Sequence, residues 1–379
     1  MDVNKEEATH DPPLLPLDLL HKIFLLLPYK FLLRLKCVSK SWYHVINSPD
    51  FIKLHLSHSL KSNSNKTLIL YAHNSLYTLE FHDLPCRVIE LPYHQAMAYY
   101  PLPKQQDFEI MGSCNGLLCI KFNNDKLALY NPATQAYKGL PNVPSTRGCR
   151  TLYPEVQFSY DCISDDYKIL RFAQSPIPSY GKPEWITFLY SLKINAWEII
   201  LNPPWGWHSI KLPCIIYFET RLPSILVNNA LHWIDRNRKN IKCFDLFTLK
   251  YYEIALPEDI TPYDYFFLAV LNEQLIILTS CLDIWLMKEY GVRQSWTQLF
   301  RRPSIPFKPA YSLWNHGLSL ACTKDGCKIL VVSMGGPLNF ICCDLESQEA
   351  KKVEIPGLSI PSRFSAVLPW VESLVPLSN

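Results

Sequence analysis

The sequence lacks several features that would assign it to a large functional class. No apolar run approaches the roughly 18 residues that cross a membrane, and no charged segment followed by the apolar core of a secretory leader opens the chain. With 37 Lys and Arg against 34 Asp and Glu, neither sign of charge is in excess, so neither nucleic acid nor a membrane is expected as a partner. These absences lead us to expect a protein of the cytoplasm, the nucleus or both.

Glycine is scarce, with 12 residues in 379, and the glycine-rich motifs that bind nucleotides are missing. Neither a P-loop nor a dinucleotide-binding fingerprint occurs. The 13 cysteines are odd in number and several lie in apolar segments, which favours free buried thiols over disulfides. Their spacing does not supply paired zinc ligands. We therefore expect no cofactor and no metal.

An apolar stretch over residues 15–46 predicts three short helices. Residues of the first recur at helical spacing: Leu15, Leu19, Leu20, Ile23, Phe24 and Leu27. Pro28 ends that helix, and Ser39 can cap a third one that carries Trp42. Four more apolar residues lie off the principal stripe: Leu25, Leu26, Phe31 and Leu33. This surplus exceeds what one small core can bury, so it predicts a partner surface.

The stretch resembles an F-box. The matching positions are Leu15-Pro16, Leu19-Leu20, Ile23, Leu27-Pro28, Leu32, Leu35 and the segment Val38-Ser39-Lys40-Ser41-Trp42. The resemblance implies a module that binds a Skp-type adaptor and, through it, a cullin. The expected adaptor contacts are Leu15, Pro16, Leu19, Leu20, Ile23, Phe24, Leu32, Val38, Lys40 and Trp42, some of them shared with the module's own core. The alternative is an ordinary helical hairpin that caps the next domain.

Composition divides the chain into five parts and predicts an α+β multidomain protein. We expect a disordered tail over 1–13, a three-helix F-box over 14–57, a Ser/Asn-rich linker over 58–66, an all-β domain over 67–370 and a tail over 371–379. A further helical turn or two is expected over 50–57.

A pattern recurs through the all-β region: an apolar strand, a short polar turn and a second strand, often followed by Leu-Pro or Ile-Pro. Copies begin at Leu76, Leu127, Thr187, Ile241, Leu282 and Asn339. Their steps, on the order of 40 to 60 residues, are typical of four-stranded propeller blades with variable loops. The pattern predicts a β-propeller of about six blades, with a seventh only if the 202–226 segment or the termini complete another.

The same region resembles the kelch-like, type 1 F-box-associated domain of plant F-box proteins. The matching segments are 112–118, 130–134, 160–161 with 165–168, 229–233 and 284–292. Together with the F-box, the resemblance implies a non-enzymatic subunit of an SCF-type ubiquitin ligase, whose propeller binds an unknown target protein for ubiquitination. The alternative is a propeller scaffold that binds the adaptor without delivering targets for degradation.

The best enzyme candidate is Cys114, because Gly112-x-Cys114-x-Gly116 matches a nucleophile elbow with cysteine in place of serine. An apolar strand follows the motif where an elbow needs a helix, so a glycine-flanked turn is favoured over a cysteine hydrolase. His232 lies between Leu231 and Trp233 without an assignable carboxylate or nucleophile, which favours a structural histidine over a general base.

Three weaker features concern binding. Trp205 and Trp207 are candidate aromatic anchors for a target, with loop packing as the favoured alternative. Arg236 and Arg238 lie in a basic turn that could meet an acidic epitope, with a solvated loop as the favoured alternative. The acidic cluster over 161–166 predicts a solvated hairpin tip, because it offers too few oxygens for calcium.

Overall fold

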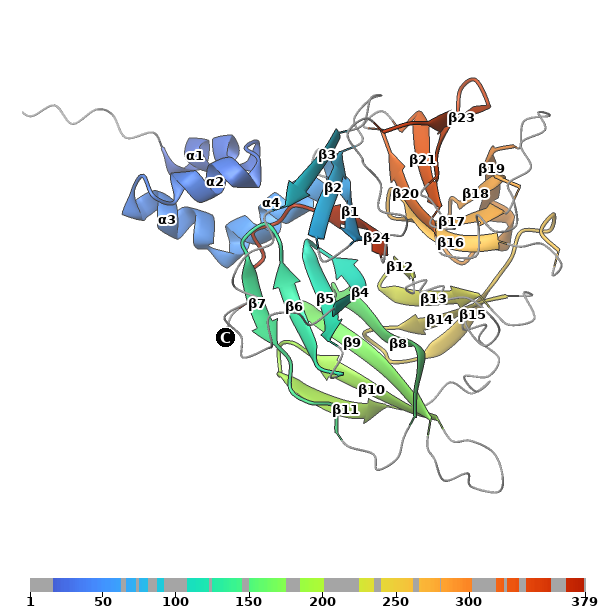
Figure 1. Ribbon diagram of the computed structural model, residues 1–379, viewed down its shortest axis with the longest axis horizontal. Helices are drawn as coiled ribbons and strands as arrows, with labels where there is room; N and C mark the ends of the chain where they lie inside the picture. Colours follow the sequence, from blue (N-terminus) through green and yellow to red (C-terminus); the bar gives the residue numbers. More distant parts are fainter. Residues whose placement is uncertain are drawn as a thin grey trace, which may run out of the picture.

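The computed structural model describes residues 16–62, 66–72, 75–80, 87–91, 108–122, 125–144, 150–174, 185–200, 225–234, 240–261, 266–279, 281–301, 318–323, 326–333, 339–355 and 366–377. A group of helices precedes a ring of β-sheets (Figure 1). The predicted fold class, a helical F-box region followed by a six-bladed propeller, is confirmed.

The helical module consists of α1 (Leu17–Leu25), α2 (Tyr29–Leu35), α3 (Lys40–Asn47) and α4 (Pro49–Ser62). Pro16 and Pro28 directly precede α1 and α2, where the N–H that proline lacks would have no partner inside the helix. Ser39 caps α3, because its hydroxyl oxygen accepts a hydrogen bond of 3.2 Å from the backbone N–H of Trp42. The proline and serine positions therefore determine where these helices begin.

Helix α4 runs through residues 58–62, where the sequence predicted a linker. His55 and Ser59, four residues apart on one face of the helix, are both buried. The polar composition of this segment was therefore misleading, because residues 58–62 belong to a helix and Ser59 within them is buried. Helix α4 continues to Ser62, and residues 63–65 lie outside the described part of the chain.

The described β region forms six four-stranded antiparallel sheets around a common centre (Figure 1). Blade 1 consists of β24 (Ala366–Val371), β1 (Lys66–Ala72), β2 (Ser75–Glu80) and β3 (Arg87–Leu91). Blade 2 consists of β4 (Phe108–Cys114), β5 (Leu117–Phe122), β6 (Leu127–Asn131) and β7 (Ala136–Gly139). Blade 3 consists of β8 (Arg150–Asp161), β9 (Asp166–Gln174), β10 (Trp185–Ser191) and β11 (Ala196–Ile200).

Blade 4 consists of β12 (Ile225–Val227), β13 (Ala230–Ile234), β14 (Asn240–Asp245) and β15 (Tyr251–Ala255). Blade 5 consists of β16 (Phe266–Leu271), β17 (Gln274–Thr279), β18 (Ile284–Met287) and β19 (Trp296–Phe300). Blade 6 consists of β20 (Leu318–Cys322), β21 (Lys328–Ser333), β22 (Asn339–Asp344) and β23 (Glu349–Val353). The six predicted repeats are the last two strands of each blade. The first-named strand of every blade lies at the centre of the ring, where β4 adjoins β8 and β24.

The turns of the repeat share one local device. In blades 2, 4 and 6 an Asn or Asp ends the third strand, and its side-chain oxygen accepts hydrogen bonds from the backbone N–H groups two and three residues later. These residues are Asn131, Asp245 and Asp344. The fifth residue of each turn then has a positive φ of 55–60°. Because this geometry is local, the repeat could be recognised from the sequence.

The C-terminal strand closes the ring. β24 is the innermost strand of blade 1 and pairs antiparallel with β1, from Lys66↔Val371 to Tyr71↔Ala366. The termini therefore complete the first blade instead of adding a seventh. The predicted tail over 371–379 is corrected: Val371 ends β24, and Ser373, Leu374 and Val375 are buried, because this segment crosses blade 2 beneath the helical module.

Two kinds of contact join the helical module to the propeller. The core of the module and the side chains of blades 1 and 2 form one continuous apolar cluster. Lys53 of α4 makes an ion pair with Asp165, in the turn between β8 and β9. The C-terminal segment lies at the same end of the blades, since Ser373 donates a hydrogen bond of 2.7 Å to the carbonyl oxygen of Asn115, in the turn between β4 and β5.

Candidate functional site

Helix α1 exposes an apolar face away from its own core. Leu19, Ile23 and Leu26 are spaced by four and three residues, so they lie on one side of the helix, and they are 46%, 45% and 72% exposed. Three more exposed apolar side chains follow: Phe31 of α2, Val38 of the turn between α2 and α3, and Tyr43 of α3. We call these six residues the helix patch.

The core of the module is filled by other side chains. Leu20, Phe24, Leu32, Ile46 and Phe51 are buried. Trp42 is half-buried and packs edge-to-face on Phe24, with ring centroids 5.3 Å apart. In Figure 1 helix α4 lies between the other three helices and the blades, so α1–α3 project from the propeller. The exposed apolar residues are thus additional to a complete core.

The helical module concentrates positive charge. Residues 16–62 contain seven Lys and Arg against two Asp, whereas the whole chain has a net charge of only +3. Lys22, Lys30, Arg34 and Lys40 are all exposed on α1–α3. A partner with acidic side chains around an apolar centre would complement this surface.

The structure separates the predicted adaptor contacts into two groups. Leu20, Phe24 and Leu32 are buried core residues, and Trp42 is half-buried against them. Pro16, Leu19, Ile23, Val38 and Lys40 are exposed, whereas Leu15 lies outside the described residues. Leu26, Phe31 and Tyr43 are also exposed apolar residues, but they are not among the predicted contacts. The sequence had marked Leu26 and Phe31 as surplus apolar residues, but it carried no signal for Tyr43.

Burial lowers the pKa of two groups inside the module. His55 is buried and its Nε2 lies 3.1 Å from the carbonyl oxygen of Leu27, while desolvation lowers the pKa of the imidazole. Lys36 donates a hydrogen bond of 2.7 Å to Oδ1 of Asn47, and burial lowers its pKa as well. These contacts connect α2 to α3 and α4 to the loop after α1.

A carboxylate is partly buried where the module meets blade 1. Desolvation raises the pKa of Glu372 to about 7; Glu80 of β2 acts in the same direction and Lys30 of α2 opposes it. Burial, with a smaller contribution from the charge of Glu372, raises the pKa of the neighbouring Tyr29 hydroxyl. The junction therefore contains an acid that titrates near neutral pH.

Cys114 does not lie in a nucleophile elbow. It ends β4, and the tight turn of Asn115 and Gly116, with φ of 52° and 86°, leads directly into strand β5. Burial raises the pKa of the Cys114 thiol to about 12, so a reactive thiolate is strongly disfavoured. The glycine-flanked turn favoured by the sequence is what the structure contains.

Two other sequence candidates are structural. His232 is buried, with Nδ1 3.0 Å from the carbonyl oxygen of Ile225 and Nε2 2.7 Å from the hydroxyl of Tyr290, and burial lowers its pKa to about 4. Asp161 differs from the predicted solvated tip, because it is fully buried and forms an ion pair of 2.8 Å with Lys168. It also accepts a hydrogen bond from Asn229, which connects blade 3 to blade 4.

The remaining candidates, Trp205, Trp207, Arg236 and Arg238, lie outside the described residues. The strands that flank them can be placed: β11 ends at Ile200, and β13 ends at Ile234. Both ends lie on the face of the propeller opposite the turns that contact the helical module. No group of His, Cys, Asp or Glu within the described ranges could hold a metal, and no helix there is long and apolar enough to cross a membrane.

Comparison with known proteins agrees with this architecture. Residues 13–54 match the F-box domain family, and residues 69–377 match the family described as the F-box associated beta propeller domain. The F-box protein CPR1 of Arabidopsis thaliana is 30% identical, over 95% of this chain and 88% of that protein. The F-box protein At4g22390 of the same plant is 28% identical, over 95% and 90% of the two chains.

Proposed function

The chain belongs to the F-box proteins that carry an F-box associated β-propeller domain, and on that premise we propose that it is a substrate receptor of an SCF-type ubiquitin ligase. The helical module binds a Skp-type adaptor, which connects it to a cullin. The propeller binds the target protein. The receptor performs no bond chemistry of its own.

The helix patch is the observation that carries this proposal. Its six apolar side chains are exposed although the module already has a filled core. Burying a half-exposed Leu, Ile or Phe contributes on the order of 1 kcal/mol, so the patch can supply several kcal/mol to an interface. The basic residues around it suit an acidic partner.

The junction between the helical module and the propeller explains how binding of the adaptor positions the target protein. The continuous apolar cluster and the Lys53–Asp165 ion pair hold the helices against the propeller, and the buried C-terminal segment belongs to the same cluster. A target on the propeller is then held at a constant position relative to the adaptor. The receptor contributes proximity to ubiquitin transfer, because a lysine of the tethered target has a high effective concentration at the ubiquitin-charged enzyme.

Copurification of the full chain with a Skp-type adaptor and a cullin tests the proposal. We expect the unaltered protein to retain both, and Ile23→Asp to lose both, since a charge would be buried in the interface. Leu54→Asp is the matched control, because Leu54 is a half-exposed apolar residue on α4 outside the helix patch. The proposal is wrong if the unaltered protein retains no adaptor, or if both variants behave alike.

A further inference from the structure

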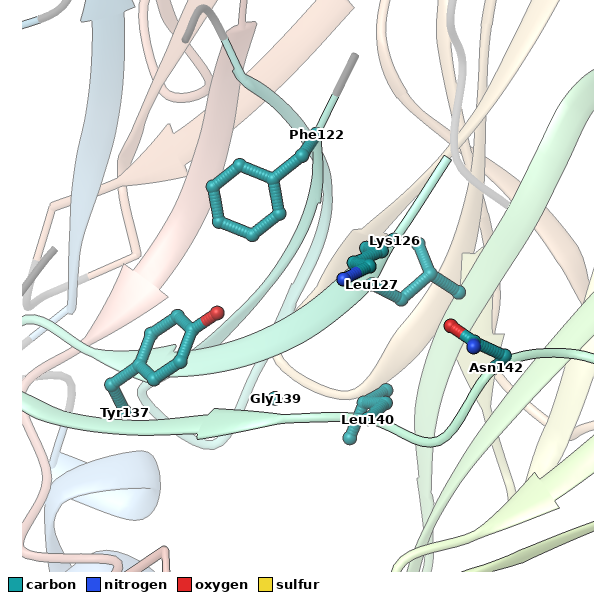
Figure 2. Close-up of a pocket in the computed structure, with 7 residues that line it drawn as sticks. All are labelled: Phe122, Lys126, Leu127, Tyr137, Gly139, Leu140 and Asn142. Atoms are coloured by element: carbon teal, nitrogen blue, oxygen red, sulfur yellow. The ribbon is translucent and has the colours of Figure 1, made fainter. Parts of the chain in front are cut away.

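The pocket in blade 2 belongs to the packing of the propeller (Figure 2). Its volume is about 90 Å³, and Lys126 and Tyr137, which line it, already interact with other groups of the protein. Phe122, Leu127 and Leu140 are members of the apolar cluster that continues into the helical module. The helix patch differs, because none of its six residues belongs to an apolar cluster of the described part of the chain.

Basic side chains border the apolar residues of the helix patch. Lys22 and Leu26 are four residues apart on α1, so they share one side of that helix. Arg34 lies over the ring of Phe31, with its Cζ atom 5.9 Å from the ring centroid. Lys40 is the first residue of α3. A partner that covers the apolar residues therefore also meets these cations.

Three of these cations have no acidic partner within the residues that the structure describes. None of the ion pairs found there includes Lys22, Arg34 or Lys40, and all three side chains are exposed. Lys30, also exposed, differs because its charge acts on Glu372 at the junction. An acidic segment placed over the helix patch would reduce the mutual repulsion of these positive charges.

The residues that precede α1 have the opposite charge. The tail predicted over 1–13 lies outside the described residues, and its sequence contains Asp2, Glu6, Glu7 and Asp11 against a single lysine. Residues 16–62 contain seven Lys and Arg against two Asp. Charge complementarity therefore makes this segment of the chain a suitable occupant for the helix patch.

The acidic residues of the tail are close enough in the chain to reach the helix patch. Pro16 directly precedes α1. The ten residues from Pro16 back to Glu6 can span up to about 35 Å, whereas the nine residues of α1 extend only about 13 Å. Attachment to the same chain gives the tail a high effective concentration at the helices, so even weak ion pairs favour its binding.

We infer that the acidic tail (residues 1–13) binds over the helix patch in the free protein and is displaced when the adaptor binds. The inference rests on the proposed function, because it concerns regulation of the adaptor site. Exposed ion pairs are individually weak, so the tail competes with the adaptor without excluding it. The apparent affinity for the adaptor is then reduced in proportion to the fraction of molecules whose helix patch is uncovered.

The first test compares adaptor affinity between the full chain and an amide variant that combines Asp2→Asn, Glu6→Gln, Glu7→Gln and Asp11→Asn. We expect the amide variant to bind a Skp-type adaptor about three- to tenfold more tightly at an ionic strength of about 0.05 M. The difference should fall below about twofold at about 0.5 M, because salt screens exposed charges over a few ångströms.

A matched control changes the net charge by the same amount at a distance from the helices. It replaces four exposed acidic residues of the propeller with glutamine: Glu198, Glu273, Glu346 and Glu354. Adaptor affinity of this variant should stay within about twofold of the unaltered chain, because exposed charges beyond a Debye length are largely screened.

The second test locates the tail without the adaptor. A photoreactive p-benzoylphenylalanine replaces Ala8, between Glu7 and Asp11, in the full chain. We expect crosslinks to α1–α3, with a yield at least about threefold lower in the amide variant and in the presence of saturating adaptor. Mixing ¹⁴N- and ¹⁵N-labelled chains distinguishes crosslinks within one chain from those between two copies.

Several outcomes would overturn the inference: equal adaptor affinity of the unaltered chain and the amide variant, an equal gain in the propeller control, or crosslinks that lie outside α1–α3, join two copies or persist unchanged in the amide variant. Absence of the adaptor from the unaltered chain would refute the proposed function. Unchanged affinity with the adaptor still bound would refute only the role of the tail.

Discussion

The indole of Trp370 donates a hydrogen bond of 2.9 Å from Nε1 to the carbonyl oxygen of Gly116. Trp370 lies in β24, the strand that closes the ring, and Gly116 lies in the first turn of blade 2. This contact connects the end of the chain to the adjacent blade, directly beneath the helical module. Closure of the propeller and the position of the C-terminal segment therefore depend on the same few residues.

Replacing Gly116 with alanine should destabilise the protein by about 2–4 kcal/mol. A Cβ at this position would lie 2.2 Å from Oγ of Ser373 and 2.7 Å from the carbonyl oxygen of Val371, and φ is +86°. Gly326→Ala is the control, because φ there is +75° but a Cβ would meet nothing within 4 Å. We expect it to cost only about 1 kcal/mol, the conformational term alone. Thermal or denaturant unfolding measures both; equal losses would contradict the close approach.

Asn131→Ala should be more destabilising than the same change at an equivalent turn. Besides holding its own turn, the Asn131 side chain donates hydrogen bonds of 3.1 and 2.8 Å to the carbonyl oxygens of Ser373 and Val375. Asp344 makes the same local turn in blade 6. We expect losses of about 2–4 kcal/mol for Asn131→Ala and about 1 kcal/mol for Asp344→Ala, because only the first leaves buried groups without partners. Chemical denaturation of both variants measures the difference.

Phe24 and Ile23 are adjacent in the chain, but replacing them should affect different properties: stability for Phe24 and adaptor binding for Ile23. Phe24 is 2% exposed and contacts Trp42 and Phe51, so Phe24→Ala should lower the free energy of unfolding by about 3–5 kcal/mol. Ile23 is 45% exposed, so Ile23→Ala should change stability by less than about 1 kcal/mol but weaken adaptor binding. Unfolding and adaptor affinity are measured on both proteins. A large loss of stability for Ile23→Ala would contradict the exposed position of Ile23 in the helix patch.

The stability of the junction should depend on pH through Glu372. Its pKa is raised from 4.5 to about 7 in the folded protein, so the folded state binds the proton more tightly than the unfolded state. Stability should therefore fall as pH rises from about 4.5 to 7 and then become constant, with a total effect of about 2–3 kcal/mol. Glu372→Gln should remove this dependence and be more stable than the unaltered protein above pH 7.

The comparison of Glu372→Gln with Glu198→Gln controls for a general effect of removing a negative charge, since Glu198 is exposed on the edge strand β11. Melting temperatures across this pH range measure the difference between the two variants. A stability advantage of Glu372→Gln that persists unchanged at pH 4.5 would contradict a titrating carboxyl at this site.

Local features were predictable because their causes are local. The hairpins of the repeat follow from Asn or Asp side chains that bind backbone groups two and three residues later, as at Asn131. The start of α3 follows from Ser39. The extension of α4 was not predictable from composition, because burial of Ser59 depends on what packs against it.

The sequence by itself determined that a helical F-box precedes a propeller of repeated hairpins, because helical spacing, prolines and turn residues act over a few positions. Only the tertiary structure decided how the parts close and which apolar residues remain exposed. The pairing of β24 with β1 joins strands from opposite ends of the chain, and no local pattern specifies it. Likewise Leu19 and Leu20 are equally apolar neighbours, yet one is 46% and the other 6% exposed, because burial is set by the helices packed around them.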